Sequence, residues 1–512
     1  MAEPYYITTA ISYPNGKPHI GHAYEAIAAD AIARFHRQAG RDVRFQTGTD
    51  EHGLKMVQTA RDKGVEVRAL ADEMSGLFRS MCDSLDISYD HFIRTTEPDH
   101  HRASQAIWEA MAANDDLYLS RYEGWYSVRD EAFYDEKELV EGEGGEKLSP
   151  QGTPVTWTAE ESWFFRLSKY QQPLLDHYAA NPDFIRPESR RNEVMRFVEG
   201  GLSDLSVSRT SFDWGVKVPG AEGHVMYVWV DALTNYLTGT GYPDAASPLA
   251  KYWPADLHVI GKDIVRFHTV YWPAFLMSAK LALPKAVFGH GFLLNRGEKM
   301  SKSVGNVTDP MDLIARFGVD ALRYFMLREV SFGQDGSYSE EAIVTRCNAD
   351  LANNLGNLAQ RCLSIIAKNC DGKVPAPGES TAIEQALSDS LAKARTELDE
   401  AMDDLALHNA LEAVWSAARF ANQYFAEQAP WSVRKTDPAR ADTILYHAAE
   451  AIRRLAILAR WAIPGGADKL LDLLAQAPDA RDFDALDRPL APGIALPAPS
   501  GVFPRLEMPA DA

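Results

Sequence analysis

Residues 5–22 read YYITTAISYPNGKPHIGH, and this stretch decides the fold. Tyr5 to Ala10 is rich in β-forming side chains and predicts a strand, whereas Ser12 to Pro18 carries turn signals. From His19 a helical pattern runs towards Gly40. A strand, a loop and a helix in this order deliver a phosphate to the first turn of the helix, where unpaired backbone N–H groups and the helix dipole attract anions. The stretch therefore predicts a nucleotide-binding α/β unit.

Two histidines open the predicted helix. His19 and His22 share one helix face, and Gly21 between them has no side chain to obstruct the approach of a nucleotide. Imidazoles at this place can hydrogen-bond the phosphates of ATP while the α-phosphorus becomes five-coordinate. Such donors accelerate a reaction when they bind the transition state better than the ground state. The alternative is a pair of histidines that cap a surface helix.

A second motif, Lys299-Met300-Ser301-Lys302-Ser303, lies at the other end of the α/β pattern. It follows an apolar run from Val287 to Leu294, which predicts a strand, and a loop that contains Gly297. Two ammonium groups on a mobile loop can close on a triphosphate and neutralise the charge that builds on the leaving pyrophosphate. The alternative is a solvated pair of lysines.

The α/β pattern continues after the first unit. Asp42 to Thr47 predicts a second strand, which a loop from Gly48 to Gly53 and a helix follow. Loops at the carboxyl ends of parallel strands are where such sheets bind ligands, so Asp50 is placed to meet a substrate ammonium group. An aspartate at a helix N-cap is the alternative.

Farther along, the pattern changes twice. It becomes irregular from about Asp116 to Glu222, which predicts an insertion, and the sheet is expected to resume at Val225 to Val230 and again at Leu257 to Gly261. Beyond about Glu340 almost every segment has a helical period, until the weak signals of the tail after Pro464. We therefore predict an α/β fold with a Rossmann-type parallel-sheet catalytic domain. An insertion splits this domain, and an all-α helical bundle follows it.

Composition sets further bounds. With 512 residues the chain exceeds the usual size of one hydrophobic core, and no long apolar span or leader is visible, so we expect a cytoplasmic protein without a membrane segment. The net charge of −20 argues against nonspecific nucleic-acid binding, although a local basic groove can still hold RNA. Cys82, Cys347, Cys362 and Cys370 show no C-x-x-C spacing, which predicts reduced thiols and neither a structural zinc site nor a disulfide framework.

The two motifs together resemble the paired signatures of class I aminoacyl-tRNA synthetases. Within that class, three segments narrow the resemblance to the methionyl-tRNA synthetases, and the resemblance covers nearly the whole chain. These segments are Ala10 to Gly16, the string from Tyr227 to Leu233 (YVWVDAL), and the string from Gly261 to His268 (GKDIVRFH). The resemblance implies a ligase that activates methionine with Mg²⁺-bound ATP to methionyl-adenylate. It then transfers the methionyl group to the 3′ end of methionine tRNA, initiator and elongator alike.

The resemblance also implies a set of site residues. The expected methionine pocket consists of Ala10, Ile11, Tyr13, Asp50, Trp229, Ala232, Leu233, Tyr236, Ile264 and His268. The expected ATP site consists of His19, Gly21, His22, Glu25, Gly261, Asp263, Lys299, Ser301 and Lys302, of which His19, His22, Lys299 and Lys302 are the expected catalytic residues. The expected anticodon-reading residues are Asn357, Arg361 and Trp431.

Each of these roles has a plainer alternative. Trp229 and Tyr236 also suit an ordinary core, although as part of the whole set they favour a pocket whose aromatic rings contact a polarizable thioether. Glu25 and Asp263 also suit solvated surface charges. Trp431 follows a proline at a helix end, where an indole can stack on an unstacked base, but packing is its alternative role.

With the resemblance, the expected division of the chain can be stated. It comprises the first catalytic half at 1–115, the connective insertion at 116–224, the second catalytic half at 225–295, the Lys-Met-Ser-Lys-Ser loop and stem-contact region at 296–340, the anticodon-binding helical domain at 341–463 and a C-terminal tail at 464–512.

Departures from the family pattern are informative. Leu233 replaces the proline of some members, and the insertion has none of the cysteine clusters that bind zinc in many members, so we expect no zinc. The insertion also looks too short for an editing domain. The chain carries no appended oligonucleotide-binding domain of the kind that some members use to dimerise, so we expect a monomer.

Two other classes of protein remain to be weighed. A cofactor adenylyltransferase shares the H-x-G-H helix but is usually one small domain without a long helical extension. A noncatalytic RNA-binding paralogue predicts the loss of motif residues, and none of those named above is missing.

Overall fold

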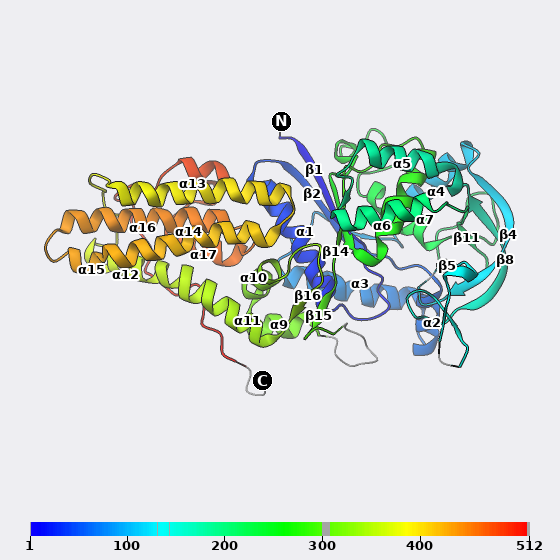
Figure 1. Ribbon diagram of the computed structural model, residues 1–512, viewed down its shortest axis with the longest axis horizontal. Coiled ribbons are helices and arrows are strands. Elements are labelled where there is room, and N and C mark those ends of the chain that lie inside the picture. The colour runs from blue at the N-terminus through cyan, green and yellow to red at the C-terminus, as the bar shows by residue number, and fades with distance from the viewer. Residues whose placement is uncertain (1, 131, 143, 299–307, 509–512) are drawn as a thin grey trace.

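The computed structural model describes residues 2–130, 132–142, 144–298 and 308–508. A sheet-centred part lies at the middle of the elongated molecule, a bundle of long helices at one end and an antiparallel sheet at the other (Figure 1).

Six parallel strands form the central sheet, in the order β3-β2-β1-β13-β14-β9. Their bounds are Pro4–Thr9 for β1, Asp42–Thr49 for β2, His91–Arg94 for β3, Ile185–Arg186 for β9, Leu257–Gly261 for β13 and Val287–His290 for β14. The strand order reverses between β1 and β13, and open parallel sheets bind ligands outside the carboxyl ends of the strands at such a reversal. The prediction of a Rossmann-type parallel sheet is confirmed.

Helices cover the two faces of this sheet because its strands are apolar on both sides. Tyr6, Ile7 and Val259 are fully shielded from solvent. Helix α1 (Ile20–Gln38) is rich in small residues, and its alanines at positions 28, 29 and 31 are also fully buried, so the helix packs closely. The other helices of this part are α2 (Leu54–Lys63), α3 (Val67–Ser84), α4 (Pro98–Ala113), α7 (Val228–Thr238) and α8 (Trp272–Ser278).

A second, antiparallel sheet occupies the stretch expected to be an insertion. Its strands follow the order β10-β8-β4-β5, with β4 and β8 as a long central pair. The elements of this region are β4 (Leu117–Ser127), β5 (Ala132–Tyr134), β6 (Val140–Glu141), β7 (Lys147–Leu148), β8 (Thr156–Phe165), α5 (Gln171–Ala180), α6 (Glu188–Glu199), β10 (Leu205–Ser206) and β11 (Ser208–Arg209). Strand β9, from the same stretch, adds the outer strand of the central sheet.

The expectation that the sheet resumes at Val225 to Val230 is wrong. Only β12 (Val225–Met226) is extended, and it pairs antiparallel with β11 outside the central sheet. Helix α7 begins at Val228. A short apolar run does not distinguish a strand from a buried helix, and tertiary packing decides between them.

The remainder of the described chain is mainly helical. The helical period expected beyond about Glu340 is confirmed: α13 and α14 form a hairpin, and α16 packs against both of them. The elements of this part are β15 (Leu293–Asn295), α9 (Pro310–Phe317), α10 (Val319–Glu329), β16 (Gly336–Tyr338), α11 (Glu340–Cys347), the π-helical segment η6 (Asn348–Gly356), α12 (Asn357–Asn369), α13 (Ala382–Asp403), α14 (Leu407–Gln428), α15 (Pro430–Val433), α16 (Pro438–Ala459) and α17 (Pro464–Leu473).

The tail expected after Pro464 is more ordered than its composition indicates. It opens with α17, whose Leu470 and Leu471 are fully buried. Farther on, Leu506 exchanges two backbone hydrogen bonds with the side chain of Asn348 at 2.8 and 2.9 Å. The last described segment therefore lies along the bundle.

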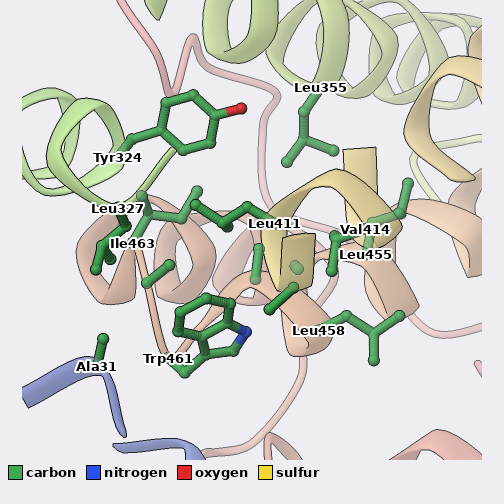
Figure 2. Packing of buried hydrophobic residues seen from close by; sticks show 14 of the residues in the cluster. Ala31, Tyr324, Leu327, Leu355, Leu411, Val414, Leu455, Leu458, Trp461 and Ile463 are labelled. Atoms are coloured by element: carbon green, nitrogen blue, oxygen red, sulfur yellow. The ribbon is translucent and has the colours of Figure 1, made fainter. Parts of the chain in front are cut away.

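One hydrophobic core joins the sheet-centred part to the helical bundle. Ala31 of α1, Leu327 of α10 and the fully buried Trp461 belong to the same cluster (Figure 2). The buried carboxylate of Asp30 in α1 also accepts a hydrogen bond from the buried guanidinium of Arg323 in α10, at 2.6 Å. No helix within the described residues is long and apolar enough to cross a membrane.

Candidate active site

A cavity of about 530 Å³ lies at the carboxyl ends of the central strands. Its lining includes Ala10 after β1, Asp50 after β2, Gly261 at the end of β13 and His290 at the end of β14. The pocket therefore lies where the strand order reverses, as the parallel topology requires.

The pocket brings together segments that are far apart in the sequence. All the residues expected to bind methionine line it, namely Ala10, Ile11, Tyr13, Asp50, Trp229, Ala232, Leu233, Tyr236, Ile264 and His268. It is also lined by every described residue expected to bind ATP, namely His19, Gly21, His22, Glu25, Gly261 and Asp263. Lys299, Ser301 and Lys302 lie outside the described residues.

The two histidines at the start of α1 cap the helix and line the pocket. Nδ1 of His19 accepts a hydrogen bond from the backbone N–H of Gly21, and Nδ1 of His22 accepts one from the N–H of His19, both at 3.1 Å. These bonds place the ring proton of each neutral imidazole on Nε2. A Cβ at Gly21 would lie 2.9 Å from the His19 ring, so only glycine leaves room for this arrangement. His19 and His22 therefore cap the helix, as the alternative proposed, and they also line the pocket.

One end of the pocket is aromatic and uncharged. Tyr236 donates a hydrogen bond to Nε2 of His268 at 2.7 Å, while Nδ1 of His268 donates to the carbonyl of Ile264 at 3.0 Å. Burial lowers the pKa of His268 to about 4, so its ring is neutral at neutral pH. Trp229 stacks on Phe267, with ring centroids 3.8 Å apart. This end therefore offers polarizable rings without a formal charge.

Asp50 is anchored beside this aromatic end. Its backbone N–H donates to the carbonyl of Ser12 at 2.9 Å, and Asp50 is buried. Helix α2 has Gly53 as its N-cap, so the alternative that Asp50 caps this helix is wrong. A buried carboxylate at the rim of an apolar pocket suits an ammonium group.

The pocket also contains a buried acid and base. Oε2 of Glu25 lies 2.8 Å from Nε2 of His290. Burial raises the pKa of Glu25, and the Glu25 carboxylate in turn raises the pKa of His290 against its own burial. The alternative that Glu25 is a solvated surface charge is wrong, because its side chain is only 15% exposed. Sequence reasoning missed His290, which belongs to no motif.

The second sheet contributes side chains that sequence reasoning also missed. Arg129 lines the pocket from the turn before β5, Tyr134 from β5 and Gln151 from the turn between β7 and β8, while Lys55 lines it from α2. Asp130 holds these turns together, because its Oδ2 accepts hydrogen bonds from the hydroxyls of Ser149, Thr153 and Tyr134 at 2.5–3.1 Å. None of these residues stands in a recognisable motif, so only the fold identifies them.

The residues expected to read an anticodon lie in the helical part, away from the pocket. Asn357 is the first residue of α12 and is exposed. The guanidinium of Arg361 lies over the Trp431 ring, 4.9 Å from its centroid. Trp431 is 41% exposed, so it is not a core residue. Arg361 and Trp431 therefore form a cation–π pair whose indole is partly open to solvent.

Within the described part of the chain, no group of three or more histidine, cysteine, aspartate and glutamate side chains could hold a metal ion. The cysteines are all free thiols. Burial raises the pKa of Cys82 to about 12, which keeps its thiol protonated.

Comparisons with known proteins cover nearly the whole chain. Residues 5–363 match the family model of tRNA synthetases class I (M), and residues 374–510 match that of the anticodon binding domain of methionyl tRNA ligase. The chain belongs to the methionine–tRNA ligases. The resemblance drawn from the sequence is confirmed.

Named relatives align with almost the full length of the chain. The methionine–tRNA ligase of Brucella suis is 62% identical over 98% of both chains, and that of Mycobacterium bovis is 60% identical over 99% of both. The structure of the Mycobacterium tuberculosis methionyl-tRNA synthetase in complex with methionyl-adenylate has a TM-score of 0.96 at 60% identity, and covers 98% of this chain and 100% of its own. The apo form of that enzyme has a TM-score of 0.90 at 56% identity, with 99% of each chain covered.

Proposed function

We propose that this pocket activates methionine with ATP to methionyl-adenylate, and that the methionyl group is then transferred to the 3′ end of a methionine tRNA. The observation that carries the proposal is that one cavity is lined by residues of both expected substrate sites, the methionine site and the ATP site. Membership of the methionine–tRNA ligases supports it independently.

In the first step, the methionine carboxylate attacks the α-phosphorus of ATP, and pyrophosphate leaves. We assign to His19 and His22 the stabilisation of this transition state. Their capping bonds use Nδ1 as the acceptor, which leaves Nε2 of each neutral ring as the donor. Lys299 and Lys302 would neutralise the leaving pyrophosphate, and Ser301 would contact the phosphates. Mg²⁺ is proposed to arrive on the ATP phosphates, the usual way in which this ion enters such sites.

The nucleoside end of ATP is assigned to the segments around Gly21, Glu25, Gly261 and Asp263. Without a Cβ, Gly261 leaves room for the carboxylate of Asp263, whose Oδ1 would lie 2.6 Å from a Cβ at this position. The Glu25–His290 pair supplies buried hydrogen-bonding groups beside it.

Methionine recognition is assigned to the aromatic end and to Asp50. The neutral chain from Tyr236 through His268 presents polar atoms without a charge, which suits an uncharged thioether. Ala232 and Leu233, both buried, complete the apolar wall with Ile11. The Asp50 carboxylate would pair with the α-ammonium group.

In the second step, a terminal hydroxyl of the tRNA displaces AMP from methionyl-adenylate, so no side chain needs to act as a nucleophile. We propose that Asn357, Arg361 and Trp431 read the anticodon of both initiator and elongator methionine tRNAs. The exposed indole beside the Arg361 guanidinium supports this assignment.

Three expectations stay proposals: a cytoplasmic location, a monomer, and the absence of resident zinc. Sedimentation equilibrium of the purified chain tests the monomer, and elemental analysis tests the absence of zinc.

The experiment that tests the function is ATP–pyrophosphate exchange measured with each of the twenty amino acids and with norleucine. Methionine is expected to support exchange far better than leucine or norleucine, because the pocket combines polarizable rings with an ammonium anchor. Equal exchange with leucine would refute the assignment. Exchange without any amino acid would favour a nucleotidyltransferase instead.

A further inference from the structure

A network of buried polar side chains joins segments that carry pocket residues, and the mechanism above makes no use of it. At its centre is Asp231 of α7, which is completely buried. Its Oδ2 lies 2.7 Å from Nδ1 of His52, and its Oδ1 lies 2.7 Å from Nε2 of His100. His52 belongs to the loop after β2 and His100 to α4, so one carboxylate joins three separate segments.

Hydrogen-bond chemistry determines which atom is the donor in each of these bonds. Burial alone would raise the pKa of Asp231, but the two histidines more than offset this and hold it below its usual range. An ionised carboxylate only accepts hydrogen bonds, so each facing ring nitrogen must donate. His100 makes a second contact with α7, because its Nδ1 lies 3.0 Å from Oγ1 of Thr238. A further titratable group close to this network is His101, whose ring lies 5.4 Å from that of His52.

The segments joined by Asp231 carry the two halves of the proposed methionine pocket. Asp50, the proposed ammonium anchor, stands two residues before His52 in the same loop. Ala232 and Tyr236, which line the apolar wall, stand on α7 beside Asp231. The position of Asp50 relative to this wall therefore depends on how the loop is fastened to α7.

We propose that Asp231, through His52 and His100, is a positioning residue that sets the distance between the ammonium anchor and the apolar wall, and so determines the affinity for methionine. The inference rests on the proposed function, because it concerns how methionine is held. Asp231 itself does not line the cavity.

A competing explanation assigns this role to Glu51. Its carboxylate accepts hydrogen bonds from Arg94 at 2.6 and 2.9 Å and from Thr96 at 2.6 Å, which fastens the loop to β3 and the residues after it. If these bonds were sufficient, the Asp231 network would only stabilise the fold. The two explanations differ in what happens to methionine binding when His52 is changed.

The experiment measures the KM values for methionine and for ATP in pyrophosphate exchange, using the full chain. His52→Ala removes the donor to Asp231 and is expected to raise the methionine KM about tenfold or more, the size expected when a hydrogen bond to a charged group is lost. The ATP KM should change by no more than about twofold. His52→Asn places an amide nitrogen near the position of Nδ1 and should restore most of the methionine affinity.

Asp116→Asn is the matched control. Asp116 is also a completely buried carboxylate, which accepts hydrogen bonds from Tyr170 and Ser278 and does not line the pocket. This variant should lower the unfolding temperature without raising the methionine KM. An equal rise of both KM values in His52→Ala, or an equal methionine KM in the alanine and asparagine variants, would overturn the proposal.

If His52→Ala does not fold, Asp231→Asn decides the question, because it keeps the shape of the side chain, removes the charge and replaces one of the two acceptor oxygens by an NH2 donor. A methionine KM equal to that of the unmodified chain would then overturn the proposal, and a selective rise would support it. Failure of the proposed function is seen separately, as an unmodified chain that does not exchange with methionine.

Discussion

Replacement of Trp431 by alanine should separate tRNA recognition from amino-acid activation. The indole is 41% exposed, and one face lies against the Arg361 guanidinium, 4.9 Å from the ring centroid. Stacking of a base on such a ring contributes about 1–3 kcal/mol, so kcat/KM for aminoacylation should fall by about 5- to 150-fold. Pyrophosphate exchange should barely change, because no tRNA takes part in the first step.

The same structure limits the effect of this change on stability. The lost cation–π contact at an exposed site is worth about 0.5–1 kcal/mol, whereas truncation of a buried tryptophan costs about 3–5 kcal/mol. Trp431→Ala should therefore melt within a few degrees of the unmodified chain. Trp157→Ala is the matched control, because Trp157 is 55% exposed and lies in the antiparallel sheet at the other end of the molecule. An early melt without a selective tRNA defect would refute the anticodon assignment.

Three further predictions concern the phosphates, metal and pH. Lys302→Ala should slow adenylate formation by about 10²-fold or more with little change in methionine binding, because the charge of Lys302 is needed mainly as pyrophosphate leaves. A defect in methionine affinity alone would contradict this prediction. The purified chain should contain no stoichiometric zinc and should stay folded in the presence of a chelator, while its activity should still require Mg²⁺. One zinc ion per chain by elemental analysis would contradict the expected absence of zinc. The pKa of His268 is lowered to about 4 by burial, so the unfolded chain binds this proton more tightly. The free energy of unfolding should therefore fall as the pH drops from 6.5 towards 4, by about 2 kcal/mol at pH 5 for this group, and His268→Gln should reduce that dependence in denaturant titrations.

The sheet could be predicted because its signals are local. The strand from Pro4 to Thr9 and the helix that begins at Ile20 are both encoded by periodicity and turn residues within one short stretch. Once two such units are known, parallel topology places their loops at one edge, and this brings Ala10 and Asp50 to the same cavity. The chemical roles of these residues stay predictions, because a lining position alone does not determine a role.

Elements that depend on tertiary packing could not be predicted. The run from Val225 to Val230 is rich in β-forming residues, yet Val228 to Val230 belong to α7, where the buried side chains of Asp231 and Asn235 hydrogen-bond with His52 and Gln46. Those bonds come from partners that are distant in the sequence, which no local pattern reports. Arg129 and Gln151 reach the pocket for the same reason, since only the folding of the second sheet brings their turns there.

Helix α1 links the two ends of this molecule. Its N-terminal histidines line the pocket, while farther along the buried carboxylate of Asp30 accepts hydrogen bonds from Arg323 at 2.6 Å and Arg34 at 2.7 Å. At its last residue, Gln38 donates to the carbonyl of Ile457 in α16 at 3.1 Å. A rotation of the helical bundle relative to the pocket would leave the Asp30 charge buried without its Arg323 partner, and breaking a buried ion pair costs about 3–5 kcal/mol. The orientation of the surface around Trp431 relative to the pocket is therefore held by the same helix that carries His19 and His22.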